Sequence, residues 1–526
     1  MVDTTIENIR DDYEVQELID MFVPDLEVFR EKLAAFDRKE IPVNEYKGFS
    51  GGYGSYAQRG AEKHMLRLRM AGGRITKERM QYIAEAMVKY DIPRAKLTTC
   101  QSVQFHDVKP EVLADAMKEA WDAGMITRGG GGDFSRNIMV SPLSGVEKGE
   151  YIDLLPYAEA EGAYVMQFLK YVKLPRKLKI CFNTNDKNEV HATFRDLGFV
   201  ATPDGKLDVY ICGGLGNNPL LGMKVAEGVD PSQIRYYIHA MVATFIEHGN
   251  FKNRGRARTR YMQLDYGMEE TKAAYLKNLE EAMAGDDVSV KPEAYIVTKT
   301  GDGTTIEDKR VVAQKQDGLY AVYYQPIGGI LTPAMTMNLW NTIKDLDQVE
   351  IRVTPEEGMY IINLTAGEAK QVLAATADGA QNLFETSVAC IGAATCQVGV
   401  RDSQGLLQAC VAAVRKENFA DGVLPRIHIS GCPSSCGTHQ IGTIGFRGAA
   451  KKTAAGPQSA FSIFYGGSAE KGAEKISVGG GAILETEIPN FLIELGRMVA
   501  ADNTTYAEWI GSNEDKLQAL IVKYTA

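Results

Sequence analysis

The sequence predicts an α+β fold made of two related halves, and three observations lead to that prediction. The chain has 526 residues, which is more than one domain usually contains. A short glycine motif with its flanking pattern occurs twice at a nearly constant spacing. Segments with helical periodicity also alternate with short apolar segments typical of strands. Together these observations indicate a pseudo-twofold duplicated, multidomain architecture.

The repeat is clearest around a pair of glycines. Gly72-Gly73-Arg74-Ile75-Thr76 recurs as Gly328-Gly329-Ile330-Leu331-Thr332, 256 residues later (328 − 72). Each copy follows an alternating strand and precedes an amphipathic helix and a second predicted strand, at 97–108 in the first copy and 353–364 in the second. Both second strands carry a threonine at the matching position. We interpret the pattern as a duplication.

The segments between and after the two copies predict mixed α and β structure. A polar, Gly- and Asp-rich segment, 284–316, predicts the crossover between the halves, with a boundary near 290–310. The expected helices are 156–171, 232–248 and 406–415, and the expected strands are 177–182, 207–212 and 426–430.

Composition narrows the class of protein. The 58 Lys and Arg residues against 68 Asp and Glu give a net charge of −10, which argues against a general nucleic-acid surface. No apolar run approaches the length of a membrane span, and the acidic N-terminal segment lacks the pattern of a secretory signal. The eight cysteines are sparse. We therefore expect a cytoplasmic protein with reduced thiols and no membrane or nucleic-acid partner.

Four cysteines form the strongest candidate metal site. Cys390 and Cys396 have five residues between them, and Cys432 and Cys436 have three. The surrounding small residues leave backbone amides free to approach thiolate sulfurs, which suits a [4Fe–4S] cluster. Structural zinc sites usually have closer pairs, so zinc fits less well. The remaining buried-type cysteines are expected to be packing residues: Cys181, Cys212 and Cys410.

A second group of residues predicts an anionic ligand. Arg67 and Arg69 alternate with apolar residues, so in a strand both would point to one face, and Lys177 and Lys179 repeat this arrangement. Arg136 and Asn137 follow the glycine run 129–132. A glycine loop permits close backbone approach to a ligand, but it is often only a turn, and alternating lysines are often only solvated.

The cysteine motif resembles the signature of the siroheme sulfite and nitrite reductases. It reads Cys-x₅-Cys, followed about forty residues later by Gly-Cys-Pro-x-x-Cys-Gly, and the likeness extends over about residues 49–450. The resemblance implies siroheme and a [4Fe–4S] cluster, with Cys436 bridging the two. It also implies two ferredoxin-like half-domains and two mixed α/β catalytic domains. The expected bounds are a helical segment 1–48, half-domains 49–120 and 300–376, and α/β domains 121–290 and 377–526.

The resemblance also implies roles for individual residues. Residues matching those that line the distal face of siroheme and hold the substrate anion, with the lysines also supplying protons, are Arg67, Arg136, Lys177 and Lys179. Residues expected at the cofactor are Arg69, Thr98, Gln104, Asn137, Gly213, Gly214, Arg256, Arg258 and Cys436. The basic run 254–260 that contains two of these residues could equally be a solvated helix end.

One position departs from the family pattern. The strand Thr98 to His106 resembles the family's Thr-x-Arg-Gln-x-x-Gln-x-His, but Cys100 stands where the family usually has arginine. The thiol is open to a redox role or a packing role. His106 is either a proton donor or, as we favour, a strand histidine whose hydrogen bonds are satisfied.

The resemblance favours sulfite over nitrite as the substrate. Lys179 occupies a position that is commonly lysine in sulfite reductases and asparagine in nitrite reductases, whereas the motif around Cys432 is closer to the nitrite enzymes. No flavin or nicotinamide fingerprint is evident, so the electrons would come from a ferredoxin or a separate flavoprotein subunit. A non-enzymatic alternative is a structural or sensory iron–sulfur or zinc protein.

Overall fold

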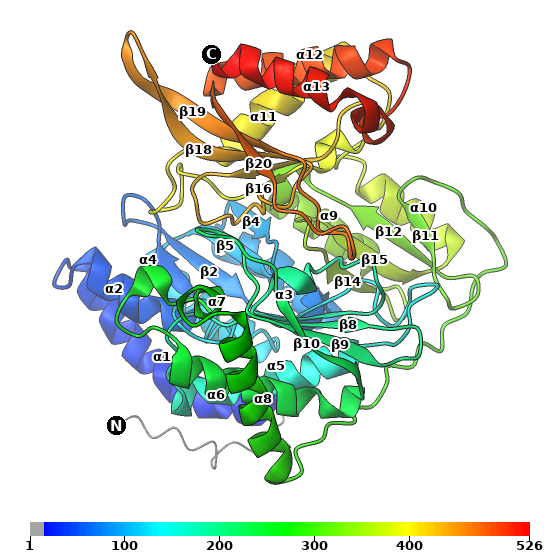
Figure 1. Cartoon of the computed structure of the whole chain (residues 1–526). Helices are drawn as coiled ribbons and strands as arrows, with labels where there is room; N and C mark the ends of the chain where they lie inside the picture. The colour runs from blue at the N-terminus through cyan, green and yellow to red at the C-terminus, as the bar shows by residue number, and fades with distance from the viewer. Residues whose placement is uncertain (1–14) are drawn as a thin grey trace.

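The computed structural model describes residues 15–526, and within them the strands form four five-stranded sheets (Figure 1). Two sheets are antiparallel and belong to the glycine repeats, and the other two mix parallel and antiparallel strands. The helices are α1 (Val15–Asp37), α2 (Val43–Ser50), α3 (Lys77–Lys89), α4 (Pro110–Asp122), α5 (Leu155–Tyr171), α6 (Ile234–His248), α7 (Arg260–Asp265), α8 (Met268–Ala284), α9 (Pro333–Ile343), α10 (Ala366–Ala375), α11 (Ser403–Val414), α12 (Ile488–Ala501) and α13 (Tyr506–Thr525).

The two antiparallel sheets exchange a strand. The short strand after each glycine pair joins the sheet of the other half, so Ile75 pairs with Ile351 while Leu331 pairs with Ala95. The first sheet has the order β1 (Ser55–Ala57), β2 (His64–Leu68), β5 (Val103–Val108), β4 (Arg94–Leu97), β13 (Ile330–Leu331). The second has the order β11 (Val311–Ala313), β12 (Tyr320–Tyr324), β15 (Met359–Leu364), β14 (Glu350–Val353), β3 (Arg74–Ile75).

The glycine motif is explained by this exchange. Gly72, Gly73, Gly328 and Gly329 all have φ between 61° and 65°, a conformation that glycine adopts at little cost. Two strand residues follow each pair. Thr76 then accepts a hydrogen bond from a backbone amide in the first turn of α3, and Thr332 does the same for α9. The motif is therefore a tight turn, a strand for the opposite sheet and a helix cap.

The two mixed sheets have the same topology, which confirms the duplication. In each, two parallel pairings are followed by two antiparallel ones. One sheet contains β6 (Met139–Val140), β7 (Ile180–Asn183), β8 (Leu197–Ala201), β9 (Leu207–Ile211) and β10 (Met223–Val229). The other contains β16 (Val388–Ala389), β17 (Ile427–Ser430), β18 (Ile444–Thr453), β19 (Gly456–Tyr465) and β20 (Val478–Leu484).

Three main hydrophobic cores follow this plan. The two exchanged sheets share one core with helices such as α1, α3 and α9, while each mixed sheet has a core of its own. Helices α11, α12 and α13 pack on the mixed sheet of the second half (Figure 1). The shared core ties the halves together, because neither antiparallel sheet is complete without a strand from the other half.

Two strand predictions were wrong in their extent. Segments 97–108 and 353–364 are not single strands: each begins at the last residue of β4 or β14, passes through a turn and ends as β5 or β15, so that the paired strands form hairpins. In the first turn Thr98 Oγ1 accepts hydrogen bonds from the amides of Cys100 and Ser102, and in the second Thr354 Oγ1 accepts from the amide of Gly358. These threonine side chains replace strand pairing at the turn, and this is why the threonines recur.

A smaller correction concerns the cationic strands. Strand β2 ends at Leu68 and strand β7 begins at Ile180. Arg69, Lys177 and Lys179 therefore lie just outside the strands that the alternating pattern predicted, and only Arg67 is a strand residue.

Candidate active site

The predicted cations form one partly buried cluster, the cationic pocket, which consists of Arg67, Arg136, Lys177 and Lys179 together with Arg258. Lys177 and Lys179 precede β7, and Arg136 precedes β6. The charges of Arg258, Arg136 and Lys179 all act on Lys177. Burial, reinforced by those charges, holds the pKa of Lys177 well below its usual range. Burial also lowers the pKa of Lys179. Several positive charges that lie this close together favour the binding of an anionic ligand.

Asp196 anchors one side of this pocket. It is fully buried, and it accepts hydrogen bonds from the backbone amide of Lys179 at 2.8 Å and from Arg258 Nη2 at 2.7 Å. The hydroxyl of Thr259 donates to its other oxygen. One carboxylate therefore fixes both the lysine segment before β7 and the arginine segment before α7, and it offsets part of their charge.

Arg67 belongs to a chain of side chains on the first sheet. Gln104 lies between Arg67 and His106: its amide oxygen accepts from Arg67 Nε at 2.9 Å, and its nitrogen donates to His106 Nε2 at 3.2 Å. The other ring nitrogen of His106 faces Gln58 at 3.1 Å. Burial lowers the pKa of His106 to about 3. His106 is therefore a neutral strand histidine with both nitrogens partnered, as we favoured from the sequence.

The glycine run forms a loop held by arginines. Arg136 donates from both terminal nitrogens, to the carbonyls of Gly130 and Gly132 at 2.6 Å each, and Arg67 also donates to Gly130. Arg69 donates to the carbonyls of Arg128, Ser135 and Arg136. The arginines thus shape the loop.

Two other predicted cofactor residues make backbone contacts. Asn137 donates to the carbonyls of Cys100 and Gln101, and Thr98 accepts the two turn amides described above. Both residues fix the turn 98–102 against the loop before β6. Their contact with a cofactor stays a prediction.

The basic run 254–260 divides into outward and inward arginines. Arg254 and Arg256 are exposed and pair with Asp133 and Asp265, so the structure does not bring Arg256 to the pocket. Arg258 reaches Asp196, and Arg260 holds the carbonyls of Asn217 and Asn218, beside Gly214. These two inward arginines lie beside the loop after β9, at the point where Gly216 of that loop approaches the carbonyls of Pro433 and Ser434.

That loop contacts the second half directly. Gly216 exchanges two hydrogen bonds with the side chain of Gln440, at 2.7 and 2.9 Å. Gly213 has no room for a side chain, because a Cβ there would lie 2.8 to 2.9 Å from three backbone atoms. Gly213 therefore permits close packing of the loop after β9 against Thr193 and Arg195 in the same half, while Gly216 makes the contact with the cysteine loop.

The four predicted cluster cysteines converge. Cys436 is partly exposed, but the surrounding protein atoms desolvate its thiol and raise its pKa, with further contributions from Cys432 and Cys396, and Cys436 in turn acts on Cys390. Lys177 and Lys179 also act on Cys436. The cysteine expected to bridge two redox centres is thus one on which the lysines of the cationic pocket act.

Small residues allow the cysteine loops to fold so tightly. Gly392 has φ 74°, and a Cβ there would lie 2.7 Å from the amide of Ser403. Cys390 Sγ accepts a hydrogen bond from the amide of Gly431 at 3.2 Å and lies 3.2 Å from the hydroxyl of Ser403. Hydrogen bonds of this kind stabilise thiolate sulfur.

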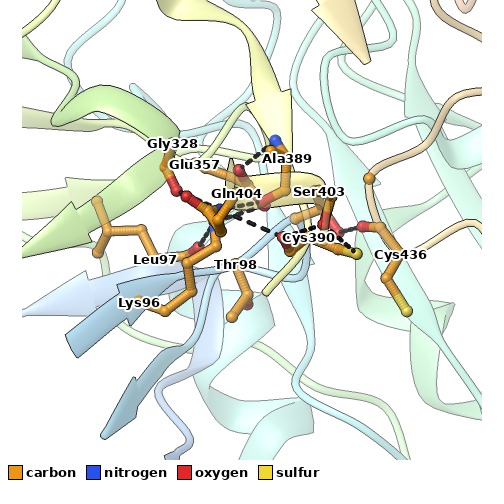
Figure 2. Close-up of polar contacts among 12 residues, drawn as sticks. Lys96, Leu97, Thr98, Gly328, Glu357, Ala389, Cys390, Ser403, Gln404 and Cys436 are labelled. Carbon is orange, nitrogen blue, oxygen red and sulfur yellow. Dashed lines mark hydrogen bonds and ion pairs between the residues drawn. The ribbon is translucent and has the colours of Figure 1, made fainter. Parts of the chain in front are cut away.

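A buried ion pair supports the Cys390 segment (Figure 2). Lys96 and Glu357 are each 2% exposed and lie 2.7 Å apart. Glu357 accepts from the amide of Ala389 at 2.9 Å, and Gln404 donates to the carbonyls of Ala389 and Cys390 at 2.7 and 3.2 Å. Residues from both halves thereby hold Ala389, the neighbour of the predicted cluster ligand Cys390.

The donor set fits a cluster beside an anionic tetrapyrrole. Burial raises the pKa of the Cys390 thiol to about 12, so a thiolate there needs a metal cation. Buried guanidinium nitrogens at Arg136 Nε, Arg258 Nε and Arg260 Nη1 have no hydrogen-bond partner, which siroheme carboxylates or a substrate anion would supply. Within residues 15–526 no three His, Cys, Asp or Glu side chains converge as ligands of one metal ion. In a [4Fe–4S] cluster, by contrast, each of the four cysteines binds a different iron.

Some residues of the site were missed by sequence reasoning. Arg195 is buried next to Cys100 and Lys179, and its neighbour Asp196 anchors the pocket. An arginine and an aspartate directly before an apolar strand were the available signal. Thr99, whose hydroxyl donates to the carbonyl of Cys436 at 2.9 Å, and Gln440 gave no signal beyond being polar.

Comparisons with known proteins agree with the fold and with the cofactors expected from the sequence. Residues 131–283 match the model "Nitrite and sulphite reductase 4Fe-4S domain", and residues 56–120 match "Nitrite/Sulfite reductase ferredoxin-like half domain". A sulfite reductase [ferredoxin] 2 of Mycolicibacterium paratuberculosis is 24% identical, covering 74% of this chain and 70% of that protein. A ferredoxin–nitrite reductase of Leptolyngbya laminosa is 26% identical, covering 78% and 82%.

A solved structure has the same fold. The NirA protein of Mycobacterium tuberculosis aligns with a TM-score of 0.73 at 21% identity, covering 92% of this chain and 95% of that one. Within the described part of the chain, no helix is long and apolar enough to span a membrane. With the two matched domain models and the convergent cysteines, the chain belongs to the nitrite and sulfite reductase family, and its cofactors are siroheme and a [4Fe–4S] cluster.

Proposed function

We propose that this oxidoreductase catalyses the six-electron reduction of sulfite to sulfide, with electrons from a separate donor protein. The observation that carries the proposal is the position of Lys177 and Lys179, which lie half-buried among arginines and act on Cys436. A pocket with two lysines suits an anion that carries up to two negative charges and must receive several protons.

The arginines and lysines have different tasks in this proposal. Arg67 and Arg136 offer fixed guanidinium donors that orient the anion and stabilise negative charge on its oxygens. Lys177 and Lys179 supply protons, because an ammonium whose pKa is lowered by burial gives up its proton more readily. Siroheme and the cluster, when bound, would pass the electrons of the donor protein to the anion.

The alternative substrate is nitrite, which the same residues could bind and protonate. Relatives that are named as nitrite reductases are about as similar to this chain as those named as sulfite reductases. Because both groups of relatives are named as ferredoxin enzymes, we infer a ferredoxin as the electron donor, with a flavoprotein subunit as the alternative. The sparse cysteines favour a cytoplasmic location.

Steady-state reduction of sulfite and nitrite by reduced methyl viologen tests the proposal without the natural donor. We expect a higher kcat/KM for sulfite, and we expect Lys179→Asn to lower sulfite turnover more than nitrite turnover. A higher kcat/KM for nitrite would reassign the substrate. Protein purified anaerobically from cells supplied with siroheme, yet without tetrapyrrole absorption, would contradict the reductase assignment itself.

A further inference from the structure

Cys100 stands at a fixed point of the cationic pocket. Its sulfur accepts a hydrogen bond from Lys179 Nζ at 3.2 Å. Its carbonyl accepts from Asn137, and the next residue, Gln101, is fully buried and donates to the carbonyls of Val140 and Val353. The turn that holds Cys100 is therefore fastened to both halves of the molecule, and the sulfur cannot easily move away from Lys179.

The surroundings of the thiol are cationic. The charged groups that act on Cys100 are Lys179, Arg195 and Arg67, and Cys100 in turn acts on Arg136. Cys181 lies behind it, and burial raises the pKa of that thiol to about 12, so it stays neutral. Burial alone would raise the pKa of Cys100, but Lys179 and Arg195 outweigh burial and lower it to about 6.

We propose that Cys100 is a positioning residue that sets substrate preference: its thiolate holds the Lys179 ammonium in place and offsets one positive charge of the pocket. The proposal rests on the proposed reduction of sulfite or nitrite by this site. It makes the Cys100–Lys179 pair, and not Lys179 alone, the determinant of the preference between the two anions.

Charge explains the expected direction. Sulfite carries up to two negative charges and nitrite carries one, so a change of pocket charge affects sulfite binding more strongly. A thiolate beside Lys179 lowers the pocket charge by one, whereas an arginine at the same place would raise it. The pair therefore moderates the preference for sulfite that Lys179 would give by itself.

The kinetic test compares the ratio of kcat/KM for sulfite to that for nitrite, measured on the full-length holoenzyme with reduced methyl viologen. Cys100→Ser keeps a hydrogen-bond acceptor of similar size but removes the charge, and we expect it to raise the ratio about fivefold to tenfold. In a Lys179→Asn background the same substitution should leave the ratio unchanged. Cys410→Ala, on the buried face of α11, is the matched control for loss of a thiol.

The pH profile adds a second kinetic readout. In the wild type, kcat/KM for sulfite relative to nitrite should change as the Cys100 thiol titrates near pH 6, and Cys100→Ser should lose that step. A Cys100→Ser ratio equal to that of the wild type, or an equal effect of the substitution with and without Lys179, would overturn the proposal.

Thiol chemistry tests the pair without turnover. Iodoacetamide reacts with thiolates, so site-resolved mass spectrometry should detect alkylation of Cys100 at pH 7, slowed about tenfold by Lys179→Met. Absence of alkylation in the wild type, or an unchanged rate in Lys179→Met, would overturn the pairing. If the wild type reduces neither anion, the proposed function fails, while the alkylation result still decides whether the pair exists.

Discussion

The first mixed sheet carries cations before its parallel strands, whereas the second carries cysteines after them. Arg136 precedes β6, and Lys177 and Lys179 precede β7; Cys390 follows β16, and Cys432 follows β17. The topology of the two sheets is the same. The comparison teaches that one scaffold presents different side chains in its two halves. In the proposed function these halves have different tasks, with the first supplying charge for an anion and the second supplying thiolates for iron.

The hairpin turns of the two antiparallel sheets show the same division on a smaller scale. Gln101 in the first half and Glu357 in the second are 256 residues apart, and each accepts from the amide of the first strand of its mixed sheet, at Val140 and at Ala389. In the first half, the acceptor is the neutral side-chain amide of Gln101. In the second half, the acceptor is the carboxylate of Glu357, which needs Lys96 as a buried partner of opposite charge.

The largest expected effect comes from the half that supplies thiolates. Cys432→Ser should remove a cluster ligand, because a serine oxygen binds iron less well than a thiolate does. We expect loss of the iron–sulfur signal in electron paramagnetic resonance and loss of turnover with reduced methyl viologen. Cys410→Ser, a core cysteine of the same half, is the control. A Cys432→Ser protein with full iron content and activity would remove this cysteine from the site.

The second effect tests the buried pair. Glu357→Gln gives the second half the residue type of the first, but leaves the Lys96 ammonium buried without a charged partner, at a cost of about 3–5 kcal/mol. We expect a clearly lower apparent Tm by thermal denaturation. Combining it with Lys96→Met should recover most of the loss, because no unpaired charge remains. If the wild type, Glu357→Gln and the double variant had the same apparent Tm, the ion pair between Lys96 and Glu357 would not be needed for stability.

The sequence predicted the duplication and which cations and cysteines lie close together better than it predicted the strand boundaries. The glycine pairs and the recurring Thr98 and Thr354 were visible because a left-handed turn and a side-chain acceptor restrict residue type. The hairpins were mistaken for single strands, since apolar alternation resumes after each turn. Asp196 was not predicted, because its role depends on segments that meet only in the folded chain.

The third effect concerns the half that supplies charge. Arg136→Gln removes a cation from the pocket and loosens the glycine loop, because both terminal nitrogens of Arg136 hold loop carbonyls. We expect kcat/KM to fall about 100-fold for sulfite and for nitrite, with the cluster signal unchanged. Arg254→Gln, on the exposed side of the same region, is the control and should have little effect. If Arg136→Gln also lost the cluster, anion binding by the first half and iron binding by the second half would not be separate tasks.

The smallest effect compares the two turns directly. Thr98→Val and Thr354→Val each remove one hydroxyl acceptor at equivalent positions, and each should lower stability by about 1 kcal/mol, seen as a small fall in apparent Tm. Their effects on turnover should differ. The turn at Thr98 places Thr99 on Cys436 and Cys100 on Lys179, whereas the turn at Thr354 only supports Glu357 behind the cluster. Thr98→Val should therefore also change the ratio of sulfite to nitrite kcat/KM, and Thr354→Val should not. Equal kinetic effects of the two variants would show that the turns act only through stability.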